Sequence, residues 1–113
     1  MDSEHLVVLA TIAGQEDGVA LAEKLVAERL AACVQVIPGG TAVYRWQETQ
    51  YVEPQVQLII KTSQSAWKGL RARLLELHPD RVPDMLALPV VDGLPAYLAW
   101  ISENTDPAAP QGR

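Results

Sequence analysis

A histidine, a cysteine and a lysine occupy positions where their side chains could support chemistry. His78 follows a helical pattern, precedes a proline and is close in sequence to Asp80 and Asp84. An imidazole beside carboxylates is a candidate divalent-metal ligand, although a closed metal site usually takes three or four ligands at fixed spacing. The alternative is a structural role, because a cationic histidine is favourable at the C-terminal end of a helix. Both interpretations of His78 stay open at this point.

Cys33, the only cysteine, stands in the run Ala-Ala-Cys-Val, where a strand is predicted to begin. Cysteines of this kind are usually buried and inert, and no basic residue adjoins Cys33 in sequence to activate its thiol. A single cysteine cannot form an intrachain disulfide, which favours a reducing compartment. We interpret Cys33 as a packing residue and expect a cytoplasmic protein.

Lys61 lies at the end of a strongly apolar stretch. In the period-two alternation of a strand, it is on the same face as Gln57 and Ile59. If other chains bury that face, the ammonium group requires an anion, supplied by a structural ion pair or by a ligand. The ligand hypothesis predicts a cleft for a small anion, lined by Trp46, Lys61, Tyr97 and Trp100. Aromatic side chains are enriched at interfaces, so Tyr44, Trp46 and Tyr51 are predicted to pack between copies of the chain.

Hydrophobic periodicity predicts the elements that would position these residues. Period-two alternation and short apolar runs predict strands at 6–12, 33–47, 51–62 and 85–91, with a hairpin loop at 48–50. Apolar spacings of three and four predict helices at 19–32, 64–77 and 94–103. The order is β-α-β-β-α-β plus a C-terminal helix, which is the α+β, ferredoxin-like plan with two helices on one face of a four-stranded sheet. In this plan Cys33 and His78 lie at opposite ends of the sheet, so they cannot share a metal within one subunit.

The central hairpin is too long for a domain of this size to cover. The stretch from Cys33 to Gln47 would extend for roughly 45–50 Å at ~3.3 Å per residue, whereas most strands stop at about 20 Å. Pro38, Gly39 and Gly40 predict a bulge and a bend near its middle. The first and last strands are apolar on both sides, which predicts burial of both faces. Both features predict an obligate oligomer in which other copies cover the arm.

Composition limits the function classes that remain. The 113 residues carry a formal net charge of −5, which argues against a nucleic acid or an anionic membrane as the main partner. The length predicts a single domain over 1–105, followed by a frayed tail at 106–113. No apolar run is long enough to span a bilayer, and no basic n-region of a signal peptide is present. No catalytic or phosphate-loop motif appears, so neither an enzyme nor a tightly bound cofactor is predicted.

Four motifs in order resemble the CutA divalent-cation tolerance family: ERLAACVQVIPGGTAVYRWQ, QLIIKT, LHPDRVPDMLALPV and VDGLPAYLAWI. The resemblance to the family runs from about Val7 to Asn104, nearly the whole chain. The resemblance implies a ferredoxin-like fold, a trimer held by edge-to-edge strand pairing, and resistance to heat. It also implies a relation in shape to trimeric PII signalling proteins, which bind effectors between subunits.

The resemblance also suggests where copper would bind. In enteric bacterial members, copper binding is attributed to a cysteine in the first strand and a histidine pair before the proline. The matching positions here are Ala10, Leu77 and His78, so one ligand of three is present. We therefore expect binding of copper(II) or another divalent cation to be weak or indirect.

Two functions remain after these considerations. The first is a cytoplasmic homotrimer involved in divalent-metal, chiefly copper, tolerance. The second is a PII-like trimeric sensor or adaptor that binds a small anionic effector in a cleft between subunits. A small enzyme has the least support in the sequence.

Overall fold

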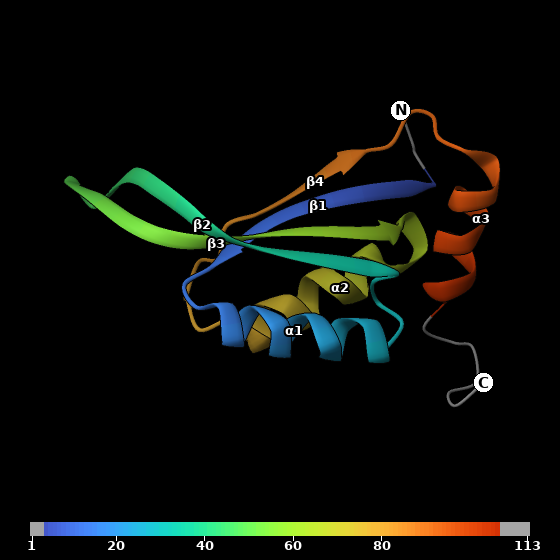
Figure 1. Ribbon diagram of the computed structural model, residues 1–113, viewed down its shortest axis with the longest axis horizontal. Coiled ribbons are helices and arrows are strands. Elements are labelled where there is room, and N and C mark those ends of the chain that lie inside the picture. The colour runs from blue at the N-terminus through green and yellow to red at the C-terminus, as the bar shows by residue number, and fades with distance from the viewer. Residues whose placement is uncertain (1–3, 107–113) are drawn as a thin grey trace.

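A four-stranded antiparallel sheet with strand order β2-β3-β1-β4 forms the frame of the protein. The computed structural model describes residues 4–106. The strands are β1 (His5–Ile12), β2 (Cys33–Trp46), β3 (Thr49–Ser63) and β4 (Met85–Pro89), and the helices are α1 (Gln15–Ala27), α2 (Gln64–Leu77) and α3 (Pro95–Asn104). This mixed α+β order is the predicted one. Figure 1 shows α1 and α2 on one face of the sheet and the β2-β3 hairpin projecting beyond it as an arm.

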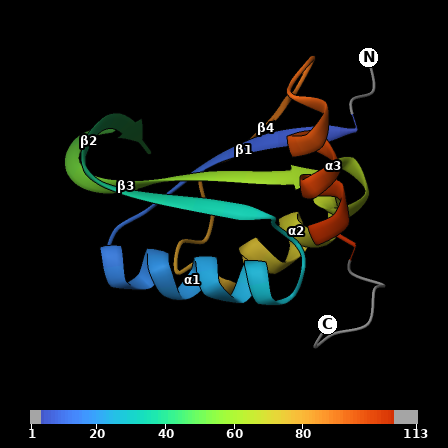
Figure 2. The same ribbon diagram turned by 45° about the vertical axis from the view of Figure 1, so that its right-hand side comes forward.

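The core lies between the sheet and the two helices, as Figure 2 shows from a second side. Alternate residues of the central strands point into it, among them Val8, Ala10, Leu58 and Ile60, and they pack against a cluster that includes Leu25, Leu70 and Leu74. The opposite set, which includes Val7, Leu9, Ile59 and Lys61, lies on what we call the open face and is half-buried. Within one protomer, therefore, only one face of β1 is fully buried. The predicted cover of the open face by other copies stays a prediction.

The predicted bounds hold for helix α2 but not for the end of helix α1. Helix α2 spans the predicted residues and stops just before the His78-Pro79 pair, because proline disfavours helical geometry in the residue that precedes it. Helix α1 ends at Ala27 rather than at the predicted Ala32. Arg29 has a positive φ of 61°, and the amides of Leu30 and Ala31 donate back to the carbonyl of Leu25. The chain thus reverses there, and Leu30 to Ala32 enter the core from a loop.

The arm joins a 14-residue β2 to a 15-residue β3 through a two-residue turn at Gln47 and Glu48. The predicted loop at 48–50 was therefore misplaced, because Thr49 already pairs with Trp46. Gln47 and Glu48 have positive φ values of 50° and 70°, the backbone that matches the twist of a two-residue hairpin.

The predicted bulge is confirmed at Pro38 and Gly39. Ile37 pairs with Gln57 and Gly40 with Gln55, so β2 has two residues where β3 has only Val56. Gly39 has a φ of 95°, which favours glycine. The bulge shifts the pairing of the two strands by one residue for the whole outer arm.

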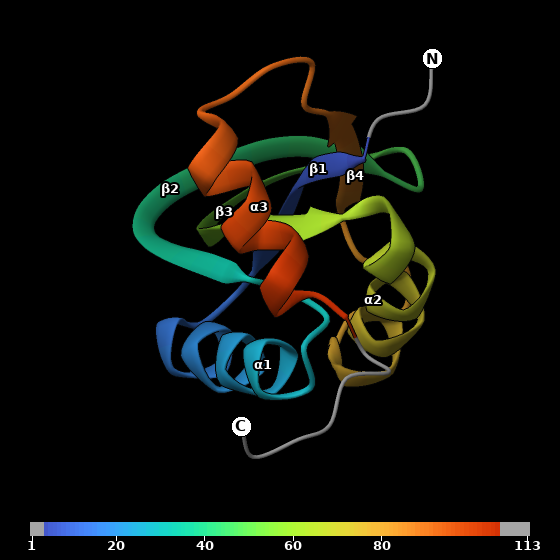
Figure 3. The ribbon, with the colours of Figure 1, turned by 90° about the vertical axis from the view of Figure 1, so that its right-hand side faces the viewer.

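The edges and the far end of the sheet complete the fold. β4 is an edge strand, and it ends at Pro89 rather than at the predicted Val91. Figure 3 shows α3 crossing the end of the sheet opposite the arm, where Arg29 donates hydrogen bonds to the carbonyls of Glu103 and Asp106. The predicted frayed tail lies outside the described residues, except for Asp106. No helix in residues 4–106 is long and apolar enough to span a membrane.

Candidate functional site

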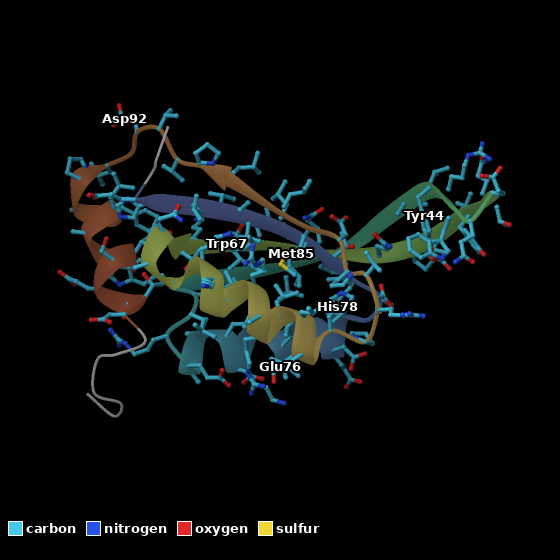
Figure 4. The ribbon with its side chains drawn as sticks, turned by 180° about the vertical axis from the view of Figure 1, so that it is seen from behind. Tyr44, Trp67, Glu76, His78, Met85 and Asp92 are labelled. Atoms are coloured by element: carbon cyan, nitrogen blue, oxygen red, sulfur yellow. The ribbon has the colours of Figure 1, made fainter. Side chains whose placement is uncertain are left out.

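His78 lies at the end of α2 beside the last residues of β1, near the base of the arm (Figure 4). The residue is only 7% exposed. The Nε2 atom is 2.7 Å from the carbonyl oxygen of Thr11, and Nδ1 is 3.0 Å from the backbone nitrogen of Asp80. A carbonyl can only accept and an amide N–H can only donate, so Nε2 carries the proton and Nδ1 accepts. This arrangement is the neutral imidazole with both nitrogens engaged.

Few candidate ligands surround His78. The Oγ1 of Thr11 donates to a carboxylate oxygen of Asp84 at 3.4 Å. Over residues 4–106, no group of three or more His, Cys, Asp and Glu side chains is arranged to hold a metal ion. Cys33 pairs with Lys61, near the opposite end of the sheet from Thr11, so the topological separation of Cys33 and His78 is as expected.

Lys61 lies in an aromatic cluster on the open face. Its Nζ donates to the phenol oxygen of Tyr97 at 3.1 Å and lies 5.2 Å from the centre of that ring. Tyr97 in turn stacks on Trp100, with ring centroids 5.5 Å apart. The hydrogen bond to Tyr97 raises the pKa of Lys61 above its usual value, against a smaller opposing effect of burial. Helix α3 thus supplies the two rings, and β3 supplies the cation.

The predicted anion cleft is only partly assembled within one protomer. Lys61, Tyr97 and Trp100 come together, whereas Trp46 lies on the arm, where it pairs with Thr49. No carboxylate among the described residues forms an ion pair with Lys61. The proposed structural ion pair therefore has no partner in residues 4–106 of the same chain.

The arm aromatics form a second cluster. The rings of Tyr44 and Tyr51 stack with centroids 5.4 Å apart, and the phenol of Tyr44 donates to the carboxylate of Glu53. This hydrogen bond, with burial and the nearby negative charges of Glu53 and Asp80, raises the pKa of Tyr44 to about 12. Trp46 lies on the same face of the arm and is 48% exposed. Packing of these rings against other copies stays a prediction.

A cavity of about 570 Å³ separates this aromatic face from the body of the protein. Its walls come from the end of β1, both strands of the arm and the loop after α2, and include Thr11, Tyr44, Trp46, Glu53, Asp80 and Val82. Sequence reasoning missed it, because nothing local shows that the loop after α2 lies opposite the arm. The only signal was the alternation of aromatic residues along 44–51.

Comparisons with known proteins agree over nearly the whole chain. Residues 6–104 match the family model described as CutA1 divalent ion tolerance protein. A divalent-cation tolerance protein CutA from Thermus thermophilus is 43% identical over 99 residues, which cover 88% of this chain and 96% of that protein.

Solved structures show the same fold. The divalent cation tolerance protein Cut A1 from Thermus thermophilus superposes with a TM-score of 0.88 at 42% identity, covering 90% of this chain and 99% of that one. CutA from Xylella fastidiosa superposes with a TM-score of 0.89 at 38% identity, covering 92% of this chain and 100% of that one.

Proposed function

The chain belongs to the CutA1 divalent ion tolerance family, and from this premise we propose that it acts in divalent-metal tolerance as a cytoplasmic homotrimer. Its own contact with copper(II) or another divalent cation is weak or indirect. The curated relatives are named as tolerance proteins, and we assign no catalytic role.

The proposal of weak metal binding rests on the hydrogen bonds that the ring of His78 makes. Both ring nitrogens are bonded to the backbone, so a metal can reach either one only after a hydrogen bond breaks. Firm binding of a transition metal also requires several ligands, and no such group occurs in residues 4–106. A site formed by side chains of more than one protomer is compatible with both facts.

Assembly into a homotrimer is supported by the surfaces that one protomer leaves uncovered. Both sheet edges, β2 and β4, are free within the described part of the single chain. Leu86 on β4 is 62% exposed, and Val43 and Val52 on the arm are 63% and 64% exposed. Unpaired edges with apolar side chains are templates for pairing with another chain.

The test combines sedimentation equilibrium with calorimetric titration of copper(II). We expect a trimer mass and a copper affinity no tighter than the high-micromolar range, weakened in His78→Ala. The control is His5→Ala, which removes the only other histidine, at the opposite end of β1. A monomer would refute the assembly, and stoichiometric copper binding that survives His78→Ala would refute the proposed metal contact.

A second candidate function is a PII-like sensor or adaptor for a small anionic effector. The lack of an ion-pair partner for the half-buried Lys61 among residues 4–106 favours it. In this proposal the arm of a neighbouring protomer brings Trp46 to the cluster of Lys61, Tyr97 and Trp100. A screen of carboxylates and phosphates by thermal shift tests it, because a ligand that binds the native state raises the melting temperature. Lys61→Ala should abolish the shift, whereas Lys68→Ala, which removes an exposed lysine of α2, should leave it unchanged.

A further inference from the structure

A small hollow, here called the helix hollow, lies between the first half of α1 and the end of α2. Its volume is about 230 Å³. The buried side chains of Ile12 and Leu21 form its floor, and Leu77 and Pro79 form its wall on the side of α2. The two helices run side by side in opposite directions on the face of the sheet away from the open face (Figures 1 and 3). The helix hollow is therefore separate from the open face, the sheet edges and the arm, which are the surfaces that other copies of the chain are proposed to cover.

The size of the helix hollow suits one large apolar side chain rather than a free metabolite. Small-molecule sites usually have volumes of about 300–1,000 Å³, and this hollow is smaller. Ala20 lies on the exposed side of α1 between Asp17 and Lys24. Because its side chain is only a methyl group, the backbone of another protein can approach α1 there. Pockets that receive a single buried anchor side chain are typical of protein–protein contacts.

Opposite charges lie at the two ends of the helix hollow. Asp17 and Lys24 both line it and are seven residues apart on α1, so they are about 10 Å apart along the helix axis at ~1.5 Å per residue. Within residues 4–106, neither of them forms an ion pair. Glu28, one turn beyond Lys24, is already held by Arg73 of α2 through two hydrogen bonds. The hollow thus offers one carboxylate and one ammonium group to a partner.

We propose that the helix hollow docks an amphipathic helix of another protein, which carries an acidic, a large apolar and a basic residue on one face. A helix laid along α1 has the same rise per residue, so its residues i and i+7 lie opposite Lys24 and Asp17. Residue i+3 or i+4 is on the same face and enters the hollow as the apolar anchor. The partner helix runs antiparallel to α1, because its acidic residue then precedes its basic residue, as the helix dipole favours.

This inference is independent of metal tolerance and of the anion cleft, since it uses neither His78 nor Lys61. The probe is a fluorescein-labelled, alanine-rich peptide of about 18 residues, long enough to be partly helical in water. It carries glutamate, leucine and lysine at positions i, i+4 and i+7, and a second peptide has the glutamate and the lysine exchanged. Fluorescence anisotropy measures the binding of each peptide to the assembled protein.

We expect the first peptide to bind more tightly than the exchanged one. Ala20→Leu should weaken its binding about tenfold or more, because the added side chain occupies the hollow, and leucine is a good helix former, so the variant should fold. Asp17→Asn and Lys24→Gln should each weaken binding about two- to fivefold, as for an exposed ion pair. The matched control is Glu23→Gln, which removes an exposed charge of α1 outside the lining and should leave the affinity unchanged.

Reversal of both charges separates docking from a loss of folding. The double variant Asp17→Lys, Lys24→Glu should prefer the exchanged peptide, because both ion pairs are then restored in the opposite sense. A variant that failed to fold would not gain affinity for a peptide that the wild type binds weakly. Circular dichroism and sedimentation confirm that each variant folds and assembles.

Three results would overturn the proposal. The first is that neither peptide binds the assembled protein. The second is equal affinity for the two peptides, or an equal loss in Glu23→Gln, either of which would show only unspecific attraction. The third is a changed oligomeric mass in Ala20→Leu, which would show that another copy of the chain occupies the hollow. The peptide titrations involve neither copper nor the anion cleft, so this proposal and the proposed function fail separately.

Discussion

Replacing His78 tests whether its ring serves the fold or a metal. His78 is 7% exposed, and its ring joins the end of β1 to the loop after α2 through hydrogen bonds of 2.7 and 3.0 Å. In His78→Ala the carbonyl of Thr11 and the N–H of Asp80 both lose their partner. A buried polar group left unsatisfied costs about 1–3 kcal/mol, and Asp80 is exposed enough for water to replace part of its loss. We expect the free energy of unfolding to fall by about 2–4 kcal/mol per protomer once the vacated volume is included.

Urea unfolding of wild type and variant at several protein concentrations measures this change, because the stability of an oligomer depends on concentration. His78→Gln is the matched control, since its amide has both a donor and an acceptor and can retain part of the two bonds. We expect it to lie between wild type and His78→Ala. If His78→Ala is as stable as wild type and loses copper binding, the structural account of His78 is refuted.

Three further outcomes are expected. Trp46→Ala should weaken assembly by about 2 kcal/mol or more in sedimentation equilibrium, as for a buried aromatic at an interface, and an unchanged association constant would count against that placement. Arg73 lowers the pKa of Glu28 through a bidentate ion pair at 2.8 and 2.9 Å. The pair therefore stabilises the fold above the unfolded-state pKa of Glu28 and loses its effect as pH falls through the lowered folded value. Glu28→Gln should destabilise by about 0.5 kcal/mol at neutral pH and by nothing at acid pH in urea titrations; an equal loss at both would refute this. Absorbance titration should place the ionisation of Tyr44 near pH 12 and return it toward 10 in Glu53→Gln; no change would show that Glu53 is not the cause.

The sequence predicted the elements whose limits depend on local chemistry. Helix α2 ends before Pro79 because the effect of a proline on the residue before it is local. The end of α1 was misplaced because Leu30 and Ala31 continue the apolar pattern, although they reach the core through a chain reversal at Arg29. The pattern showed that they were buried, but not in which backbone conformation.

The candidate sites depend on contacts between distant residues, which periodicity cannot provide. Lys61 meets Tyr97 because α3 crosses the end of the sheet at which β3 finishes (Figure 3), 36 residues later in the chain. Thr11 and His78 are 67 residues apart, so the bond that fixes the ring had no signal in sequence. Strand register also placed Trp46 far from Lys61, which the aromatic composition alone could not show.

The extra residue of β2 is absorbed where it occurs and is not passed on to the outer arm. Deleting Gly39 would leave two strands of equal length between Ile37 and Gly40, so every residue beyond it would keep its partner: Ala42 would still pair with Glu53 and Tyr44 with Tyr51. What would be lost is the local bend and the added twist that a bulge gives its strand. The bulge thus sets the direction in which the arm leaves the sheet, whereas the ladder sets which side chains share a face of the arm.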